Sequence, residues 1–178
     1  MTIKIGINGM GRIGRMILRS IYENHKGKIT IKHINNRSSP EICASLLKHD
    51  SVHGNLNAKV NFGGNFIKIN KEKISYTQHT EIDDIKWKKY NVDFVFECTG
   101  KFNSRNKLLP HLRNGAKKVI VSAPCETADK TIVFGINHKT IRKNDKIISA
   151  ASCTTNCLAP VADVINKNFT IINGFMTT

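Results

Sequence analysis

The sequence predicts an α/β protein with a doubly wound, mostly parallel sheet that carries a short antiparallel insertion. Three observations predict this fold. Apolar strand-like runs alternate with helical segments, a glycine cluster separates the first strand from the first helix, and residues 58–78 instead read as short strands joined by tight turns. Right-handed crossovers would place helices on both faces of such a sheet.

The first strand is expected at residues 3–7, where Lys4 interrupts an apolar run. The helix after the glycine cluster has apolar residues at three- and four-residue steps, which should face the core. These residues are Ile13, Ile17, Leu18 and Ile21. A second strand is expected over residues 28–34, where the sequence "KITIKHI" alternates.

A helix is expected over residues 41–49, after the polar turn "NNRSSPE". Ser38 with Glu41 three residues later resembles a capping box, and Pro40 suits a first helical turn. Within the antiparallel insertion, turns are expected at Gly63–Gly64 and at Asn70–Lys71.

The strand–helix alternation returns after residue 91. The expected elements are a strand over 92–97, a helix capped by Ser104 and reaching Arg113, a strand over 117–124, short strands over 131–137 and 146–152, a helix over 154–168, and a further strand over 169–178.

Composition narrows the possible classes of protein. The chain has 178 residues, 40% of them hydrophobic, with no membrane-length apolar run and no signal peptide. The net charge of +15 suggests anionic partners, but the lysines are spread along the chain, so a solvated surface is favoured over a specific nucleic-acid site. The five cysteines form neither a disulfide framework nor a zinc pair, which favours a reducing cytoplasm and no metal.

Gly9, Gly11 and Gly14 form the pattern G-x-G-x-x-G between a strand and a helix. In this context Gly9 allows a tight turn, Gly11 lets a pyrophosphate approach the backbone, and Gly14 lets helix and strand pack closely. The helix N-terminus would offer amide hydrogens to the phosphates. A Rossmann dinucleotide site is therefore expected, the alternative being a glycine-rich turn without a ligand.

The end of the second strand bears on the choice between NAD and NADP. Dinucleotide-binding folds usually carry a ribose-binding carboxylate there, whereas this chain has Asn36. Asparagine does not repel a 2′-phosphate, and Arg37, Ser38 and Ser39 could bind one. Alternatively, Asn36 bonds the ribose and Arg37 is solvated, so both cofactors remain open.

Cys153 stands between a predicted strand and a predicted helix. A helix N-terminus stabilises a thiolate, and Ser152, Thr154 and Thr155 add donors where an oxyanion could form. A thiolate attacks carbonyls, which suggests an aldehyde or ester substrate. Cys157, one turn later, is expected to pack in the core; Cys153 as a small core residue is the competing interpretation.

The segments "KIGINGMGRIGR", "KHDSVHG", "ECTGKF", "KKVIVSAP" and "SCTTNCLAP" occur in this order. Together they resemble the first half of the glyceraldehyde-3-phosphate dehydrogenase family, from Ile3 to Thr178. The resemblance implies a dinucleotide-binding Rossmann domain over residues 1–152 and the start of a truncated α+β catalytic domain over residues 153–178.

The resemblance also implies roles for individual residues. Cys153 would be the nucleophile, within a substrate-binding triplet of Ser152, Cys153 and Thr154. Asn36 and Thr80 stand where many relatives have an aspartate and an arginine. The cofactor-binding residues would be Asn8, Gly9, Gly11, Arg12, Ile13, Gly14, Asn36, Arg37, Thr80, Thr99, Gly100 and Ser122.

The implied activity is the phosphorylating oxidation of glyceraldehyde 3-phosphate, with inorganic phosphate and NAD or NADP, to 1,3-bisphosphoglycerate, in a cytoplasmic homotetramer. The base histidine is expected beyond Thr178, since none of the seven histidines fits by motif. The chain alone is therefore expected to be nearly inactive and, with Ile171, Ile172 and Phe175 exposed, prone to association. The alternatives are erythrose-4-phosphate dehydrogenase and a non-catalytic nucleotide- or RNA-binding module.

Overall fold

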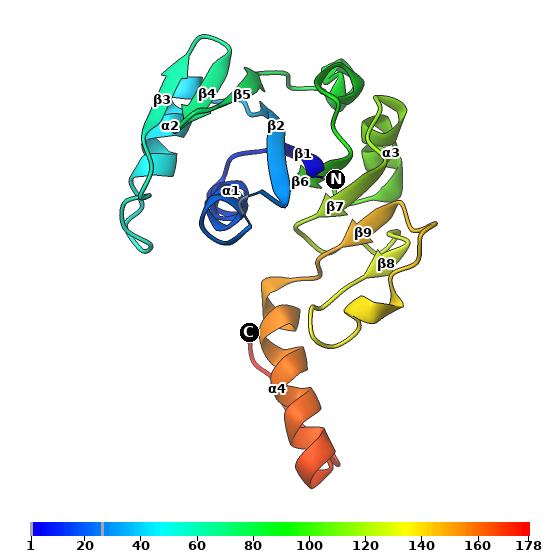
Figure 1. Cartoon of the computed structure of the whole chain (residues 1–178). Coiled ribbons are helices and arrows are strands. Elements are labelled where there is room, and N and C mark those ends of the chain that lie inside the picture. Colours follow the sequence, from blue (N-terminus) through cyan, green and yellow to red (C-terminus); the bar gives the residue numbers. More distant parts are fainter. Residues whose placement is uncertain (1, 26) are drawn as a thin grey trace.

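A computed structural model describes residues 2–25 and 27–178. Within this part of the chain, nine strands form one sheet in the order β3-β4-β5-β2-β1-β6-β7-β9-β8 (Figure 1). The pairs β3–β4 and β4–β5 are antiparallel, and all the other pairs are parallel. The predicted doubly wound sheet with an antiparallel insertion is confirmed.

The elements follow the predicted order closely. They are β1 (Ile3–Asn8), α1 (Arg12–Asn24), β2 (Ile29–Asn35), α2 (Pro40–Lys48), β3 (Val60–Gly63), β4 (Phe66–Ile69), β5 (Glu72–Thr77), the 3₁₀ turns η1 (Ile82–Asp84) and η2 (Trp87–Tyr90), β6 (Phe94–Glu97), α3 (Arg105–Arg113), β7 (Lys118–Val121), β8 (Lys130–Thr131), η3 (His138–Thr140), β9 (Ile147–Ser149) and α4 (Cys153–Phe169).

The parallel strands end in one row across the sheet. Asn35 pairs with Asn8, Asn8 with Glu97, Glu97 with Val121, and Val121 with Ser149. The segments that leave these strands therefore gather at one carboxyl edge, which is where ligands bind in open α/β sheets.

Helices α1 and α3 cover opposite faces of the sheet (Figure 1). On β6, Phe94 and Phe96 pack with the core cluster of α1, whereas Val95 faces the cluster around Trp87. Val119 pairs with Val95 and packs in the cluster that contains Leu108 of α3. This alternation confirms the prediction that helices lie on both faces, because neighbouring strand residues point to opposite faces.

Helix α1 differs from its predicted core face at one position. Leu18 and Ile21 are buried and Ile17 is half-buried, but Ile13 is 48% exposed. The prediction for Ile13 is wrong because the neighbouring Gly14 takes the position that packs on the glycine loop. The buried Arg19, which the periodicity did not indicate, donates to the carbonyl oxygen of Gly54 at 2.9 and 3.0 Å.

The predicted caps are partly wrong. Helix α2 begins at Pro40, so Ser39 rather than Ser38 is the N-cap, and its hydroxyl accepts from the amide of Ile42 at 3.3 Å. Ser104 does precede α3, but its side chain makes no cap bond. The hydroxyl of Thr127 accepts from the amide of Arg105 instead, at 2.7 Å.

Three strand predictions also change. Gly63 lies in β3 and pairs with Phe66 of β4, so the turn is at residues 64–65 instead of 63–64. The strand expected at 131–137 shortens to β8, since Asn137 accepts from the amide of Val133 at 2.8 Å and folds this segment into a turn. Residues 170–178 form no strand, because no described strand pairs with them.

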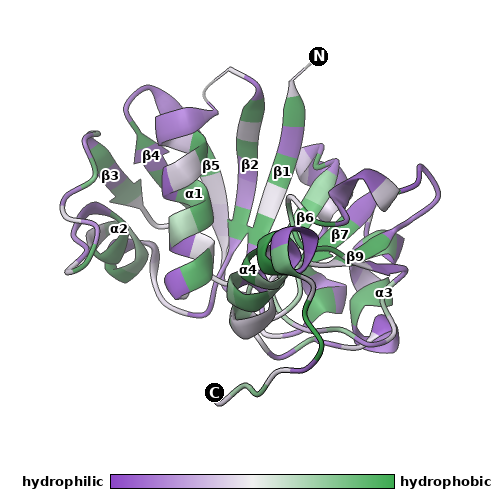
Figure 2. Cartoon of the chain, turned by 90° about the horizontal axis from the view of Figure 1, so that it is seen from below, coloured by the Kyte–Doolittle hydropathy of each residue, from purple (hydrophilic) through white to green (hydrophobic). Residues whose placement is uncertain are grey.

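Helix α4 projects from the sheet (Figure 1), and none of its residues is buried. The view along the helix shows hydrophobic positions along α4, coloured green (Figure 2). Cys157 is exposed, so the prediction that it packs in the core is wrong, because no described element covers its side of α4. As expected, Ile172 and Phe175 are exposed beyond the helix.

Two buried cysteine thiols make the stability of the fold sensitive to alkaline pH. Burial raises the pKa of the Cys43 thiol from 9.0 to about 11 and that of the Cys98 thiol to about 12. Above about pH 9 the unfolded chain loses these protons while the folded chain keeps them, so stability falls as pH rises through this window. Urea unfolding at pH 8 and pH 10.5 should show a loss of about 2 kcal/mol or more for the two thiols together. An unchanged urea midpoint would contradict this expectation.

Candidate functional site

The glycine loop joins β1 to α1 through close backbone contacts. Gly9 has φ +93°, and a Cβ there would lie 2.8 Å from the amide nitrogen of Thr99. A Cβ on Gly14 would lie 2.1 Å from the carbonyl oxygen of Gly9, whereas nothing lies within 4 Å of a Cβ on Gly11. The loop is therefore tightly packed on two sides and open at Gly11, as a pyrophosphate requires.

The N-terminus of α1 faces this opening with backbone rather than side-chain groups. Gly11 is the N-cap and supplies no side-chain bond. The guanidinium of Arg12 is turned to Asp50, at 2.6 Å. Amide hydrogens of His53 and Val52, together with Arg12, hold the pKa of the Asp50 carboxyl below its usual range. The free amides of the first helical turn are thus the groups offered to an anion.

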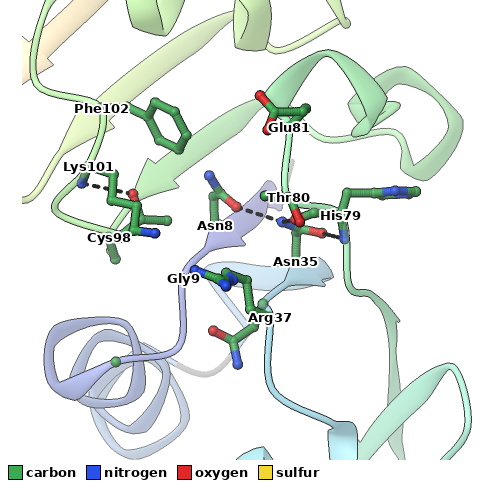
Figure 3. A pocket seen from close by; sticks show the side chains of 13 residues that line it. Asn8, Gly9, Asn35, Arg37, His79, Thr80, Glu81, Cys98, Lys101 and Phe102 are labelled. Carbon is green, nitrogen blue, oxygen red and sulfur yellow. Dashed lines mark hydrogen bonds between the residues drawn. The ribbon is translucent and has the colours of Figure 1, made fainter.

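A pocket of about 380 Å³ lies across the carboxyl edge over β2, β1 and β6 (Figure 3). Of the predicted cofactor residues, its lining includes Asn8, Gly9, Gly11, Asn36, Arg37, Thr80 and Thr99. Arg12, Ile13, Gly14, Gly100 and Ser122 adjoin these segments in the chain or the sheet but do not line the pocket. The lining also contains residues that the sequence analysis did not single out: Asn35, His79, Glu81, Cys98, Lys101 and Phe102.

The lining residues that were missed follow a simple positional rule. Asn35 ends β2, and Cys98 directly follows β6. Since the carboxyl ends of parallel strands border the ligand site, the strand ends themselves could have indicated both residues. No motif marked His79 or Glu81, which belong to the segment after β5.

Asn35 holds the wall of the pocket in place. Its amide nitrogen donates to Asn8 Oδ1 at 2.9 Å and to the carbonyl oxygen of His79 at 3.0 Å. Its side-chain oxygen accepts from the hydroxyl of Thr77 and from the amide of His79, both at 2.9 Å. All four hydrogen-bonding positions of this buried side chain are thus used, which fixes the start of the 79–81 segment.

Asn36 ties the glycine loop to β5. Its side-chain oxygen accepts from the amide of Met10 at 3.0 Å, and its nitrogen donates to the hydroxyl of Tyr76 at 3.1 Å. Arg37, beside it, is exposed at the pocket. This end of the pocket therefore presents an amide and a cation, a combination that accommodates a hydroxyl or a phosphate.

Cys153 is the first residue of α4 and is exposed. Ser152 is the N-cap, and its hydroxyl accepts from the amide of Thr155 at 3.0 Å. The preceding Ala151 has φ +61°, a strained conformation for alanine, at the turn that directs the chain into the helix. The thiol thus lies exposed at a helix N-terminus.

Cys153 and the pocket share one edge of the sheet. Helix α4 begins four residues after Ser149, the end of β9, and β9 lies two strands from β6. At the usual strand spacing this separation is about 10 Å. Cys153, Ser152 and Thr154 are not among the pocket-lining residues, so they adjoin the pocket along the edge rather than forming its wall.

A doubly wound sheet, a glycine loop open at one helix N-terminus, and a pocket across the carboxyl edge together define a dinucleotide-binding protein. Residues 3–105 match the family model "Glyceraldehyde 3-phosphate dehydrogenase, NAD binding domain", and residues 152–178 match the model of the C-terminal domain. The chain belongs to the glyceraldehyde-3-phosphate dehydrogenase family, as its motifs predicted. NAD(P) is accordingly its class of cofactor.

Curated relatives carry the same family name. The chain is 47% identical to glyceraldehyde-3-phosphate dehydrogenase of Cereibacter sphaeroides, over all of this chain and 53% of the relative. It is 44% identical to the proteins of that name from Mycoplasma pneumoniae and Geobacillus stearothermophilus, over 52% and 53% of their lengths. The chain therefore spans about half the length of the curated relatives it matches. Within the described residues, no helix has the length and apolar character needed to cross a membrane.

Proposed function

We propose that this chain provides the dinucleotide site and the nucleophile for the phosphorylating oxidation of glyceraldehyde 3-phosphate to 1,3-bisphosphoglycerate. The observation that carries the proposal is the exposed thiol of Cys153 at the N-terminus of α4, on the sheet edge that holds the dinucleotide pocket. The names of the relatives supply the substrate.

The residues present fit a nicotinamide dinucleotide. Gly11 leaves space for the pyrophosphate beside the amides of Arg12 and Ile13, and Asn36 with Arg37 would receive the adenosine ribose. Asn8, Gly9 and Thr99 line the next part of the pocket, with Thr80 on the adenine side and Gly100 and Ser122 toward the nicotinamide. When bound, the nicotinamide ring accepts a hydride from the substrate carbon.

The protein's own chemistry begins at Cys153. Its thiolate attacks the aldehyde carbon, a carbon–sulfur bond forms, and the carbonyl electron pair moves to oxygen to give the alkoxide of a thiohemiacetal. Ser152 and Thr154 flank the reacting carbon and bind the substrate. Loss of the hydride leaves an acyl thioester on Cys153. Inorganic phosphate attacks the acyl carbon, the carbon–sulfur bond breaks, and the acyl phosphate leaves as the thiolate is restored.

Three further assignments belong to this proposal. The boundary between the dinucleotide-binding domain and the catalytic domain falls between residues 152 and 153, where β9 has ended and α4 begins to project from the sheet. The active assembly is a homotetramer. It works in the cytoplasm, which the five free thiols favour.

The proposed function is tested by trapping the acyl enzyme. The test needs a single acylation and no turnover: prolonged incubation with glyceraldehyde 3-phosphate and NAD⁺ without inorganic phosphate should acylate Cys153 and form one NADH per adduct, because phosphate is needed only for release. Peptide mass spectrometry locates the adduct, and absorbance at the nicotinamide band counts NADH. Cys153→Ser should give neither product, while Cys43→Ser should give both. Acylation elsewhere, or none in the original chain, would contradict the proposal.

The ribose end should bind NAD⁺ and NADP⁺ with affinities within about tenfold of each other, because no carboxylate repels the 2′-phosphate. Arg37→Ser should weaken NADP⁺ binding about tenfold and leave NAD⁺ binding almost unchanged. Lys139→Ser, which removes an exposed lysine of η3, is the charge-matched control and should affect neither. Calorimetric titration measures all three. NAD⁺ binding far tighter than NADP⁺ in the original chain would refute this account of Asn36 and Arg37.

A further inference from the structure

A buried carboxylate lies directly behind the pocket. Glu97, the last residue of β6, is 1% exposed and does not line the pocket. Its Oε1 accepts from the amide and the hydroxyl of Thr99, at 2.8 and 2.5 Å. Its Oε2 accepts from Asn8 Nδ2 at 2.6 Å and contacts His111 Nε2 at 3.0 Å. Two of these three partners, Thr99 and Asn8, line the pocket.

The tautomer of His111 follows from its second contact. The indole nitrogen of Trp87, which can only donate, lies 2.9 Å from His111 Nδ1. His111 Nδ1 must therefore be the acceptor, and the hydrogen of the neutral ring is on Nε2, where it donates to Glu97. Both Trp87 and His111 are fully buried. On the side away from the pocket, the Glu97 carboxylate is thus held by a hydrogen bond that His111 Nε2–H donates and Glu97 Oε2 accepts.

Glu97 forms no ion pair with a lysine or arginine in the described part of the chain. Its buried oxygens are satisfied instead by four donors, and each donor has its hydrogen pointed at the carboxylate. A buried carboxylate of this kind restricts the positions of its hydrogen-bond donors, because displacing a donor leaves a buried carboxylate oxygen unpaired at a high cost in free energy. The conformations of Asn8 and Thr99 therefore depend on Glu97.

We propose that Glu97 is a positioning residue of the dinucleotide pocket. Its carboxylate holds Asn8 on β1 and Thr99 after β6 at the separation the ligand requires, and His111 with Trp87 fixes the carboxylate from behind. This inference rests on the proposed function, since it concerns the same pocket. It gives a role in binding to Glu97 and His111, neither of which touches the ligand space.

Glutamine cannot replace Glu97, although its shape is nearly the same. One carboxylate oxygen would become an NH₂ group. It would face either the donors of Thr99 or those of Asn8 and His111, so one side of the network would bring donor against donor. Glu97→Gln should raise the Kd for NAD⁺ by about tenfold or more, which corresponds to about 1.4 kcal/mol.

The matched control is Asp93→Asn, the same chemical change on the residue that precedes β6. Asp93 accepts from the amide of Lys4 and pairs with Lys117 at 2.6 Å, at the opposite end of the strand. Calorimetric titration of the full chain with NAD⁺ at 20 °C, together with thermal unfolding, should show an unchanged Kd for this variant. An equal Kd for folded Glu97→Gln and the original chain would overturn the positioning role alone. Failure of the original chain to bind NAD⁺ or NADP⁺ would overturn the proposed function as well.

A second pair of variants keeps the test decisive if Glu97→Gln does not fold. His111→Gln retains a donor for Glu97 and an acceptor for Trp87, so it should keep the Kd within about twofold. His111→Leu removes both and should raise the Kd by about tenfold. The indole N–H resonance of Trp87, the single tryptophan, reports the hydrogen bond to residue 111. The chemical shift of this resonance should change on NAD⁺ binding in the original chain and in His111→Gln but not in His111→Leu. Equal Kd values for the two His111 variants would refute the proposal.

Discussion

Iodoacetamide at pH 8 should alkylate Cys153 and Cys157 at least about 100-fold faster than Cys43 and Cys98, because the thiolate is the reactive form. Burial raises the pKa of the Cys43 thiol to about 11 and that of the Cys98 thiol to about 12. At pH 8 these values leave about one thiolate in a thousand for Cys43 and one in ten thousand for Cys98, and the protein core around Cys43 also excludes the reagent. Peptide mass spectrometry over a time course measures the four rates.

Cys157 is the internal control for the role assigned to Cys153. Both thiols are exposed on α4, but Cys153 begins the helix and Cys157 lies one turn further on. The stabilisation of an anion falls off within the first turn, so Cys153 should react the faster of the two. Equal rates for Cys153 and Cys157 would contradict a nucleophile activated by the helix N-terminus. Rapid alkylation of Cys43 would contradict the buried position of that thiol.

Replacing Gly14 by alanine should destabilise the fold by about 3 kcal/mol or prevent folding. The added Cβ would lie 2.1 Å from the carbonyl oxygen and 3.1 Å from the carbonyl carbon of Gly9. These are backbone atoms, and Gly9 is itself held against Thr99, so no side-chain rotation can relieve the contact. The free energy of unfolding, obtained from urea titration, measures the effect.

Gly11→Ala is the matched control in the same loop. No atom lies within 4 Å of a Cβ on Gly11, and its φ of −67° suits alanine, so the stability should change by less than about 1 kcal/mol. The methyl group would, however, project into the space where the pyrophosphate is expected, and NAD⁺ binding should weaken. Equal losses of stability in Gly11→Ala and Gly14→Ala would refute the roles assigned to the two glycines.

The elements that were predicted correctly depend on local patterns. The glycine loop, the helical steps of Leu18 and Ile21, and the antiparallel insertion were recognisable because each is set by neighbouring residues. The errors at Ser38 and Ser104 involve single hydrogen bonds at helix ends. Those bonds depend on where a helix starts and on partners such as Thr127, which sequence periodicity does not locate.

The sequence by itself determined the fold class, the family, the glycine loop and the place of Cys153 at a helix start, because these rest on short contiguous motifs and local periodicity. Only the tertiary structure showed that Asn35 fixes the pocket-lining segment 79–81. It also showed that the Glu97 carboxylate connects Asn8 and Thr99 to His111, which in turn accepts from Trp87. These partners are up to 89 residues apart in the chain. They meet because parallel strands bring distant segments to one edge, where buried polar atoms must find partners.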